Sequence, residues 1–257
     1  MRRTTFAVLI VATLVFGPAA IARSAGGDVE VLVDGSLAPL YFHQGTRYVE
    51  ARRGREYTLR LTNPLNVRVA VALSVDGLNT IDARHTDALS ASKWVLGPYE
   101  TVEIEGWQVS DRTARRFVFT GERNSYGAAL GETENLGVIE AIFYRERRRP
   151  IARHEPWGEK HSAGRDSARQ APAPSAAAGT ESQGALSDDY AATGMGDRTR
   201  HDVREVSLDL DPHPVASVRI RYEFRPELVK LGVLPSGRAP LERRERARGF
   251  EGYCPEP

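Results

Sequence analysis

Apolar and polar residues alternate in short runs along the first half of the chain. In the run 57–62, Tyr57, Leu59 and Leu61 alternate with polar residues. In the run 67–75, valine or leucine occupies every odd position. A period of two predicts β-strands with one buried face. Pro64 and Asn66 stand between the two runs, and turn residues there fit an antiparallel connection.

Similar runs follow at 102–105, 117–119 and 137–144. About seven short strands within roughly 120 residues, without a convincing long helix, predict a mainly β fold. We expect an immunoglobulin-like antiparallel β-sandwich, or a related barrel, over residues 28–147.

The composition changes after this region. Residues 162–185 contain none of Val, Ile, Leu, Met, Phe, Trp or Tyr. Such a segment cannot bury enough apolar surface to offset its ordering entropy, so residues 148–189 are predicted to be a disordered linker. The arginines at 145 and 147–149 could contact nucleic acid. On an exported protein the solvated end of a strand is the favoured interpretation, and no nucleic-acid partner is expected.

Alternation returns in the C-terminal part, where residues 190–235 predict a β-hairpin and a short helix. The apolar positions of its two expected strands are Val206, Leu208 and Leu210, then Val218, Ile220, Tyr222 and Phe224. Pro226 can begin a helical turn that ends at Leu231 and Gly232. Because an isolated hairpin is marginally stable, we expect this element to dock on the sandwich. Residues 236–257 are predicted to be a disordered tail.

The N-terminal residues have the three-part layout of a secretory signal peptide. Arg2 and Arg3 precede an apolar stretch at 6–16, and Ala20 and Ala22 form a small-residue cleavage site. The apolar stretch is shorter than the roughly 20 residues that span a bilayer. We therefore expect residues 1–22 to be removed and the mature protein, beginning at Arg23, to be periplasmic or secreted and not integral to the membrane.

The net charge indicates which partners are not favoured, and the cysteine count indicates how the fold must be stabilised. The formal net charge of +1 provides no global attraction to nucleic acid or to acidic lipids. Cys254 is the only cysteine, so the chain cannot form an internal disulfide and must be stabilised by its core.

The glycine-rich stretch 124–137 raises the question of a phosphate-binding loop. Such a loop needs a lysine and a helix that follows the glycines, whereas here Glu132 and Glu134 would repel phosphate. A structural turn accounts for more residues, because Ser125 can cap a single helical turn and Gly131 can end it in the left-handed conformation.

Other candidate motifs favour structural interpretations. The stretch 192–198 lacks the third glycine of a dinucleotide fingerprint, and the histidines in 153–161 are too far apart for a zinc helix. Residues 209–214 resemble a turn at a strand end, and 74–84 lacks the order of ligands in a calcium loop. No catalytic, cofactor-binding or metal-binding residue is assigned, and no cofactor is expected.

The chain resembles a group of uncharacterised exported bacterial proteins that share a domain of unknown function. The resemblance is carried by the successive blocks "VDGLNTID", "WVLGPYETVEIEGWQVS", "FVFTGERNSYGAALGETENLGVIEAIFY" and "ATGMGDR". It covers most of the mature chain. It implies an envelope protein and supplies neither an activity nor catalytic residues.

These observations favour a non-catalytic binding or structural module of the cell envelope, with an envelope protein or a glycan as its partner. The alternative is a carbohydrate-active or other hydrolytic enzyme of the periplasm. For that alternative the residues to test are Asp76, Asp82 and an aromatic set that could stack on sugars, consisting of Trp94, Tyr99, Trp107 and Tyr126.

Overall fold

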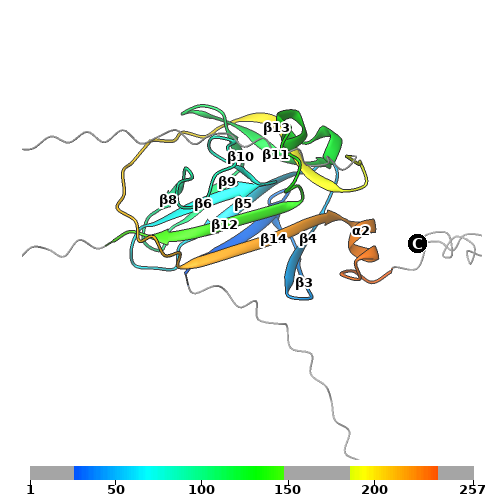
Figure 1. Ribbon diagram of the computed structural model, residues 1–257, viewed down its shortest axis with the longest axis horizontal. Helices are drawn as coiled ribbons and strands as arrows, with labels where there is room; N and C mark the ends of the chain where they lie inside the picture. The colour runs from blue at the N-terminus through cyan, green and yellow to red at the C-terminus, as the bar shows by residue number, and fades with distance from the viewer. Residues whose placement is uncertain (1–25, 148–185, 237–257) are drawn as a thin grey trace, which may run out of the picture.

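The computed structural model describes residues 26–147 and 186–236, and it shows two β-sheets packed face to face (Figure 1). This arrangement confirms the predicted mainly β sandwich. The predicted signal peptide, residues 148–185 of the predicted linker and residues 237–257 of the predicted tail lie outside the described residues.

The first sheet, sheet A, is antiparallel. Its strands run in the order β10 (Gly106–Gln108), β11 (Thr113–Gly121), β5 (Glu56–Thr62), β1 (Asp28–Val33) and β2 (Ser36–Leu37), while β9 (Thr101–Ile104) pairs with β5 and β13 (Ala191–Arg200) pairs with β11. A register shift between Arg115 and Phe117 marks a bulge in the β11–β13 ladder.

The second sheet, sheet B, is mixed. Its strands run in the order β3 (Leu40–His43), β4 (Thr46–Ala51), β14 (Ala216–Phe224), β12 (Val138–Arg145), β6 (Val69–Val75) and β7 (Leu78–Asn79), and β8 (Trp94–Leu96) also pairs with β6. The β4–β14 pair is parallel. The described helices are the 3-10 turn η1 (Glu122–Asn124), α1 (Tyr126–Leu130) and α2 (Arg225–Lys230).

The core lies between the two sheets and contains the residues that the alternation predicted to face inward. Leu59 and Leu61 of sheet A and Val71 and Phe143 of sheet B have no exposed surface. The ring of Tyr57 stacks on Phe119, with 4.2 Å between the ring centroids. Burial of these large apolar side chains supplies the main stabilisation of a chain without an internal disulfide.

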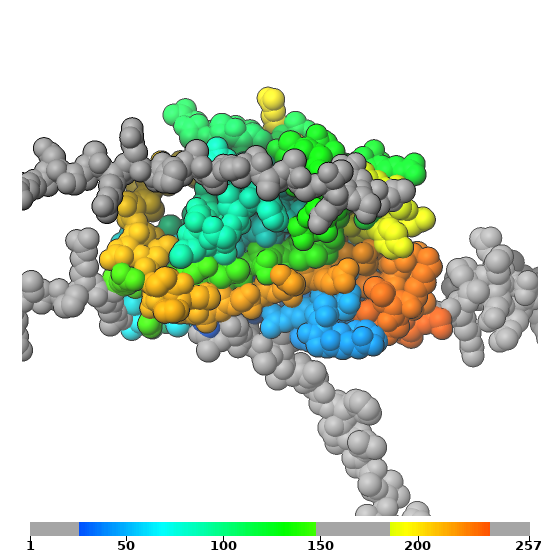
Figure 2. Space-filling view, in the orientation of Figure 1, coloured from blue at the N-terminus to red at the C-terminus, as the bar shows by residue number. Residues whose placement is uncertain are grey.

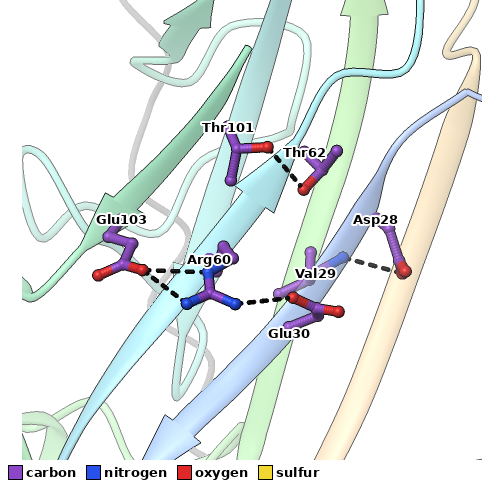
Figure 3. A network of polar contacts seen from close by, with 7 residues as sticks. All are labelled: Asp28, Val29, Glu30, Arg60, Thr62, Thr101 and Glu103. Atoms are coloured by element: carbon purple, nitrogen blue, oxygen red, sulfur yellow. Dashed lines mark hydrogen bonds and ion pairs between the residues drawn. The ribbon is translucent and has the colours of Figure 1, made fainter. Parts of the chain in front are cut away.

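The outer face of sheet A is polar, and its charged side chains pair with one another (Figure 3). Arg60 of β5 donates to Glu103 of β9 at 2.9 and 3.0 Å and to Glu30 of β1 at 3.4 Å. The three residues occupy adjacent strands, because Arg60 is directly opposite both acids in the ladders. This face is therefore a solvated surface of cross-strand ion pairs.

Three two-residue turns connect paired strands. Their central residues are Asp34 and Gly35, Gln44 and Gly45, and Asp76 and Gly77, and all six have positive φ angles. Positive φ at both positions is typical of the type I′ turn, which matches the twist of the strands that it joins. The stretch 74–84 accordingly begins with a turn, which agrees with its structural interpretation.

Both short helices have the predicted caps. The side chain of Ser125 accepts a hydrogen bond from the Ala128 backbone N–H at 3.0 Å, and Gly131 ends α1 with φ of 80°. At α2, Pro226 lies in the first turn and Gly232 follows the helix with φ of 75°. The stretch 124–137 is therefore a structural turn into β12.

The antiparallel pairing predicted for the runs 57–62 and 67–75 is wrong. β5 belongs to sheet A and β6 to sheet B, so the segment between them crosses from one sheet to the other. Asn63 is fully buried at this corner, where its Nδ2 donates to the carbonyls of Val67 and Gly97 at 2.8 and 2.7 Å. Alternation identifies strands and their buried faces, and it does not identify the partner strand.

The predicted C-terminal hairpin is also wrong in its first strand. Residues 201–209 form no strand, and Leu210 makes only an isolated bridge with Glu146. The strand before β14 is instead β13, which lies in sheet A, whereas β14 lies in sheet B between β4 and β12. Only the second predicted strand and the helical turn agree with the structure.

The C-terminal part is thus built into the sandwich rather than docked on it as a hairpin. In Figures 1 and 2, β14 runs along β12, and the β3–β4 hairpin lies beside α2. Leu228 and Leu234 of this C-terminal end pack with Tyr48 of β4 in a second small core.

Candidate functional site

A groove of about 400 Å³ lies on the outer face of sheet B. Its floor includes Ala72 and Ser74 of β6, Glu140 and Ile142 of β12, and Arg219 of β14. The segment 84–91 between β7 and β8 forms much of the wall.

The strand register explains this floor. Ala72 is directly opposite Ile142, and Glu140 is opposite both Ser74 and Arg219. Directly opposite residues share a face, so these five side chains lie together on the outer face. Alanine and serine on β6 leave the space that larger side chains would fill.

The part of the wall around Asp87 is held in place by hydrogen bonds within the segment between β7 and β8. The carboxylate of Asp87 accepts from the backbone N–H groups of Leu89 and Ser90 at 3.0 and 3.1 Å, and hydrogen bonds from Ser90 are the main cause that lowers the pKa of Asp87. Lys93 donates to the carbonyls of Leu89 and Ala91 at 2.6 and 2.7 Å. Its ammonium lies 5.4 Å from the ring centroid of Tyr144, and partial burial lowers its pKa.

The other end of the groove is at the β6–β7 turn. His85 Nδ1 lies 3.1 Å from the carbonyl oxygen of Gly77. Because a carbonyl oxygen only accepts, Nδ1 must carry the proton in this bond, which leaves Nε2 of a neutral ring as an acceptor. Asn135 lies against Gly77, since a Cβ added to that glycine would meet Asn135 Cβ at 2.7 Å.

The two arginines of the groove differ in their partners. Arg219 donates to Glu140 Oε1 from Nε at 3.2 Å and from Nη2 at 2.9 Å. Arg84 is exposed, and no acid within the described part of the chain forms an ion pair with its guanidinium. The unpaired positive charge therefore lies at the end beside His85.

Asp76 lies next to this end but inside the protein, where 2% of it is exposed. Its Oδ1 accepts from the Gly137 backbone N–H at 2.8 Å and from the Tyr222 hydroxyl, and its Oδ2 accepts from the Thr193 backbone N–H at 2.7 Å. Burial raises the pKa of Asp76 to about 7, although the hydrogen bonds from Tyr222, Thr193 and Gly137 oppose the rise.

A chain of hydroxyl groups continues from Asp76 across the core. Thr193 Oγ1 lies 2.6 Å from the Tyr222 hydroxyl and 2.7 Å from the Tyr57 hydroxyl. When Tyr222 donates to the Asp76 carboxylate, Thr193 can donate to Tyr222 and Tyr57 to Thr193, so each hydroxyl donates once. Burial raises the pKa of both tyrosines well above the usual value. The network joins the two sheets, because Tyr57 and Thr193 belong to sheet A and Tyr222 belongs to sheet B.

The residues named for the hydrolase alternative do not form one site with this geometry. Asp82 accepts from the Ser92 hydroxyl at 2.7 Å and from the Arg84 backbone N–H at 3.1 Å, as expected of a turn. Trp107 is buried and contacts Tyr126 at 5.0 Å between ring centroids. The other two aromatic residues do not stack on this pair: Trp94 contacts the ring of His201, and Tyr99 is 70% exposed.

The remaining motifs take structural positions. The stretch 192–198 belongs to β13, and Asp209 and Asp211 pair with Arg147 and Arg145. Over residues 26–147 and 186–236, no group of three or more His, Cys, Asp or Glu side chains could hold a metal ion. The histidine motif at 153–161 lies outside the described residues.

Sequence reasoning did not find the groove. Arg84 and His85 carry no motif, and Arg219 belongs to a strand more than a hundred positions later. The outward positions of Glu140 and Arg219 follow from strand alternation, but the register that brings them opposite one another does not.

Comparisons with protein-family models, curated proteins and solved structures found no match for this chain. The resemblance to uncharacterised exported proteins therefore stays a prediction. The described helices are all too short or too polar to cross a membrane.

Proposed function

We propose that this chain is an exported, non-catalytic β-sandwich protein that binds a partner in the cell envelope through the groove on sheet B. The observation that carries the proposal is a groove lined by three polar side chains without partners in the described structure, those of Ser74, Arg84 and Asn135. Small residues on β6 leave the space above its floor. Binding sites commonly combine a concave surface with a few such groups.

The lining of the groove supports a protein partner over a glycan. It contains no Trp, Tyr or Phe, and sugar-binding surfaces depend on such rings for stacking. The aromatic residues named above for sugar stacking lie outside the lining.

The position of Asp76 supports binding over hydrolysis. A general acid or base must come within hydrogen-bond reach of its substrate. Asp76 is buried, and its two oxygens already accept three hydrogen bonds from the protein.

The test compares two matched substitutions on the same face of sheet B. Ser74→Trp would fill the groove, whereas Ser217→Trp places the same side chain at an exposed β14 position outside the lining. Each variant of the mature protein is immobilised and incubated with envelope extract, and the captured proteins are identified by mass spectrometry.

We expect the wild type and S217W to capture the same partner and S74W to lose it, with all three unfolding at similar temperatures. Equal capture by S74W and S217W would show that the groove is not the binding site.

A further inference from the structure

The groove has two chemically different ends. One end is formed by Arg84, His85, Gly77 and Asn135, and the other by Asp87 near Lys93. The positive charge of Lys93 lies close enough to Asp87 to lower its pKa, so the two charges offset one another at the second end. The charge left without a partner is that of Arg84.

The Arg84 end also supplies hydrogen-bond donors. The side chains of Ser74 and Asn135 line the groove and make no hydrogen bond within residues 26–147 and 186–236. A guanidinium group binds a carboxylate through two parallel N–H donors, and neutral hydroxyl and amide donors beside it satisfy the remaining lone pairs. This set of groups fits a carboxylate better than a neutral or cationic group.

The floor strand β6 ends at this same end of the groove, where the β6–β7 turn begins. Asn135 lies against Gly77, and both residues line the groove at the β6–β7 turn. The remaining length runs over Ala72 and Ile142, which are small or apolar, and over Glu140, whose carboxylate is paired with Arg219.

We propose that the groove binds the C-terminal end of an extended peptide, with the free terminal carboxylate on Arg84 and the preceding residues over Ala72 and Ile142. The inference rests on the proposed binding function and adds the chemical class of the ligand. It assigns Arg84 as the residue that determines specificity for a chain end.

The test uses three synthetic peptides of four residues, each with an acetylated N-terminus. The first is tetra-alanine with a free C-terminal carboxylate, the second is its C-terminal amide, and the third is an amide with glutamate at the third position. Each is titrated into the isotope-labelled mature protein, and backbone amide chemical shifts are followed by NMR. The same titrations are repeated with Arg84→Gln and with a control, Arg204→Gln, at an exposed arginine outside the lining.

We expect the free-acid peptide to shift the amides of Ser74, Gly77 and His85 in a saturable way. Arg84→Gln should weaken its binding at least tenfold, and Arg204→Gln should leave it unchanged. The two amide peptides should bind at least tenfold more weakly than the free acid.

Equal binding of the free acid and its amide would overturn the inference, because the carboxylate would then contribute nothing. Preference for the glutamate peptide would overturn the terminal assignment, since the acid would come from a side chain. If no peptide binds, the inference is also overturned, whereas the proposed binding function is decided separately by the capture experiment with Ser74→Trp and Ser217→Trp.

Discussion

The side chain of Asp76 accepts hydrogen bonds from groups on three segments that are far apart in the sequence. Gly137 precedes β12, Thr193 lies in β13 and Tyr222 lies in β14. Asp76 also occupies the first central position of a type I′ turn, with φ of 52°. Aspartate tolerates this conformation better than most residues, so one residue serves both the local turn and the joining of the two sheets.

The buried carboxyl of Asp76 should make stability depend on pH. Its pKa is raised from 3.8 to about 7, so the folded state holds this proton more tightly than the unfolded state does. The contribution of Asp76 to the free energy of unfolding is therefore largest below pH 3.8 and falls as the pH rises to about 7. Inside this window the slope from one group is about 1.4 kcal/mol per pH unit.

Asp76→Asn should remove this slope, because an amide does not titrate. Between pH 5 and pH 8 the wild type should lose on the order of 2 kcal/mol more stability than the variant, measured by urea unfolding. Asp34→Asn is the matched control, since Asp34 occupies the same position in the exposed β1–β2 turn. Equal pH slopes for the wild type and D76N would contradict the account of Asp76.

At the scale of single elements, α1 is a helix whose two ends can be predicted from local sequence signals. Ser125 and Gly131 predicted both ends of this five-residue helix, because a cap depends on neighbouring residues alone. The same holds for α2, where proline and glycine mark the two ends.

Gly131→Val should destabilise the protein by about 1 kcal/mol or more, because a β-branched residue is strained at positive φ. Nothing lies within 4 Å of a Cβ added there, so the cost comes from the backbone and not from a clash. Glu132→Ala and Glu134→Ala should change stability little, since both positions are exposed. Equal thermal midpoints for all three variants would refute the cap.

The two C-terminal strands show where sequence signals fail. β14 alternates buried and exposed residues up to Arg221 and ends with three buried residues, and its apolar alternation predicts a strand. The sequence of β13, AATGMGDRTR, has two glycines and no apolar alternation, so the sequence pattern favours a strand at 206–210 instead. β13 is stabilised by partners from elsewhere, such as β11 along its length and Asp76 at Thr193, and no local pattern reveals these contacts.

At the scale of the whole molecule, the sequence predicted the two-layer fold but not the assignment of strands to sheets. Alternation defines which side of a strand is buried, whereas the crossing at Asn63 and the parallel β4–β14 pair depend on long-range packing. The groove could not be predicted from the sequence for the same reason, because its floor depends on the register of β6, β12 and β14.

Strand order makes the C-terminal part necessary for both sheets. β14 lies between β4 and β12, so without it sheet B separates into two pieces. In sheet A, β13 pairs with β11 along the length of β11. Neither strand pairs with the other, so a fragment that contains only these two has no ladder to form.

Amide hydrogen exchange on residues 23–257 and on two separate fragments, 23–150 and 185–257, tests this interleaved sandwich most directly. The account predicts that the amides of β14 are among the slowest to exchange in the intact chain, and that both fragments exchange rapidly when alone. Protection of the isolated C-terminal fragment would contradict the account, because it would show that residues 185–257 fold as an independent unit.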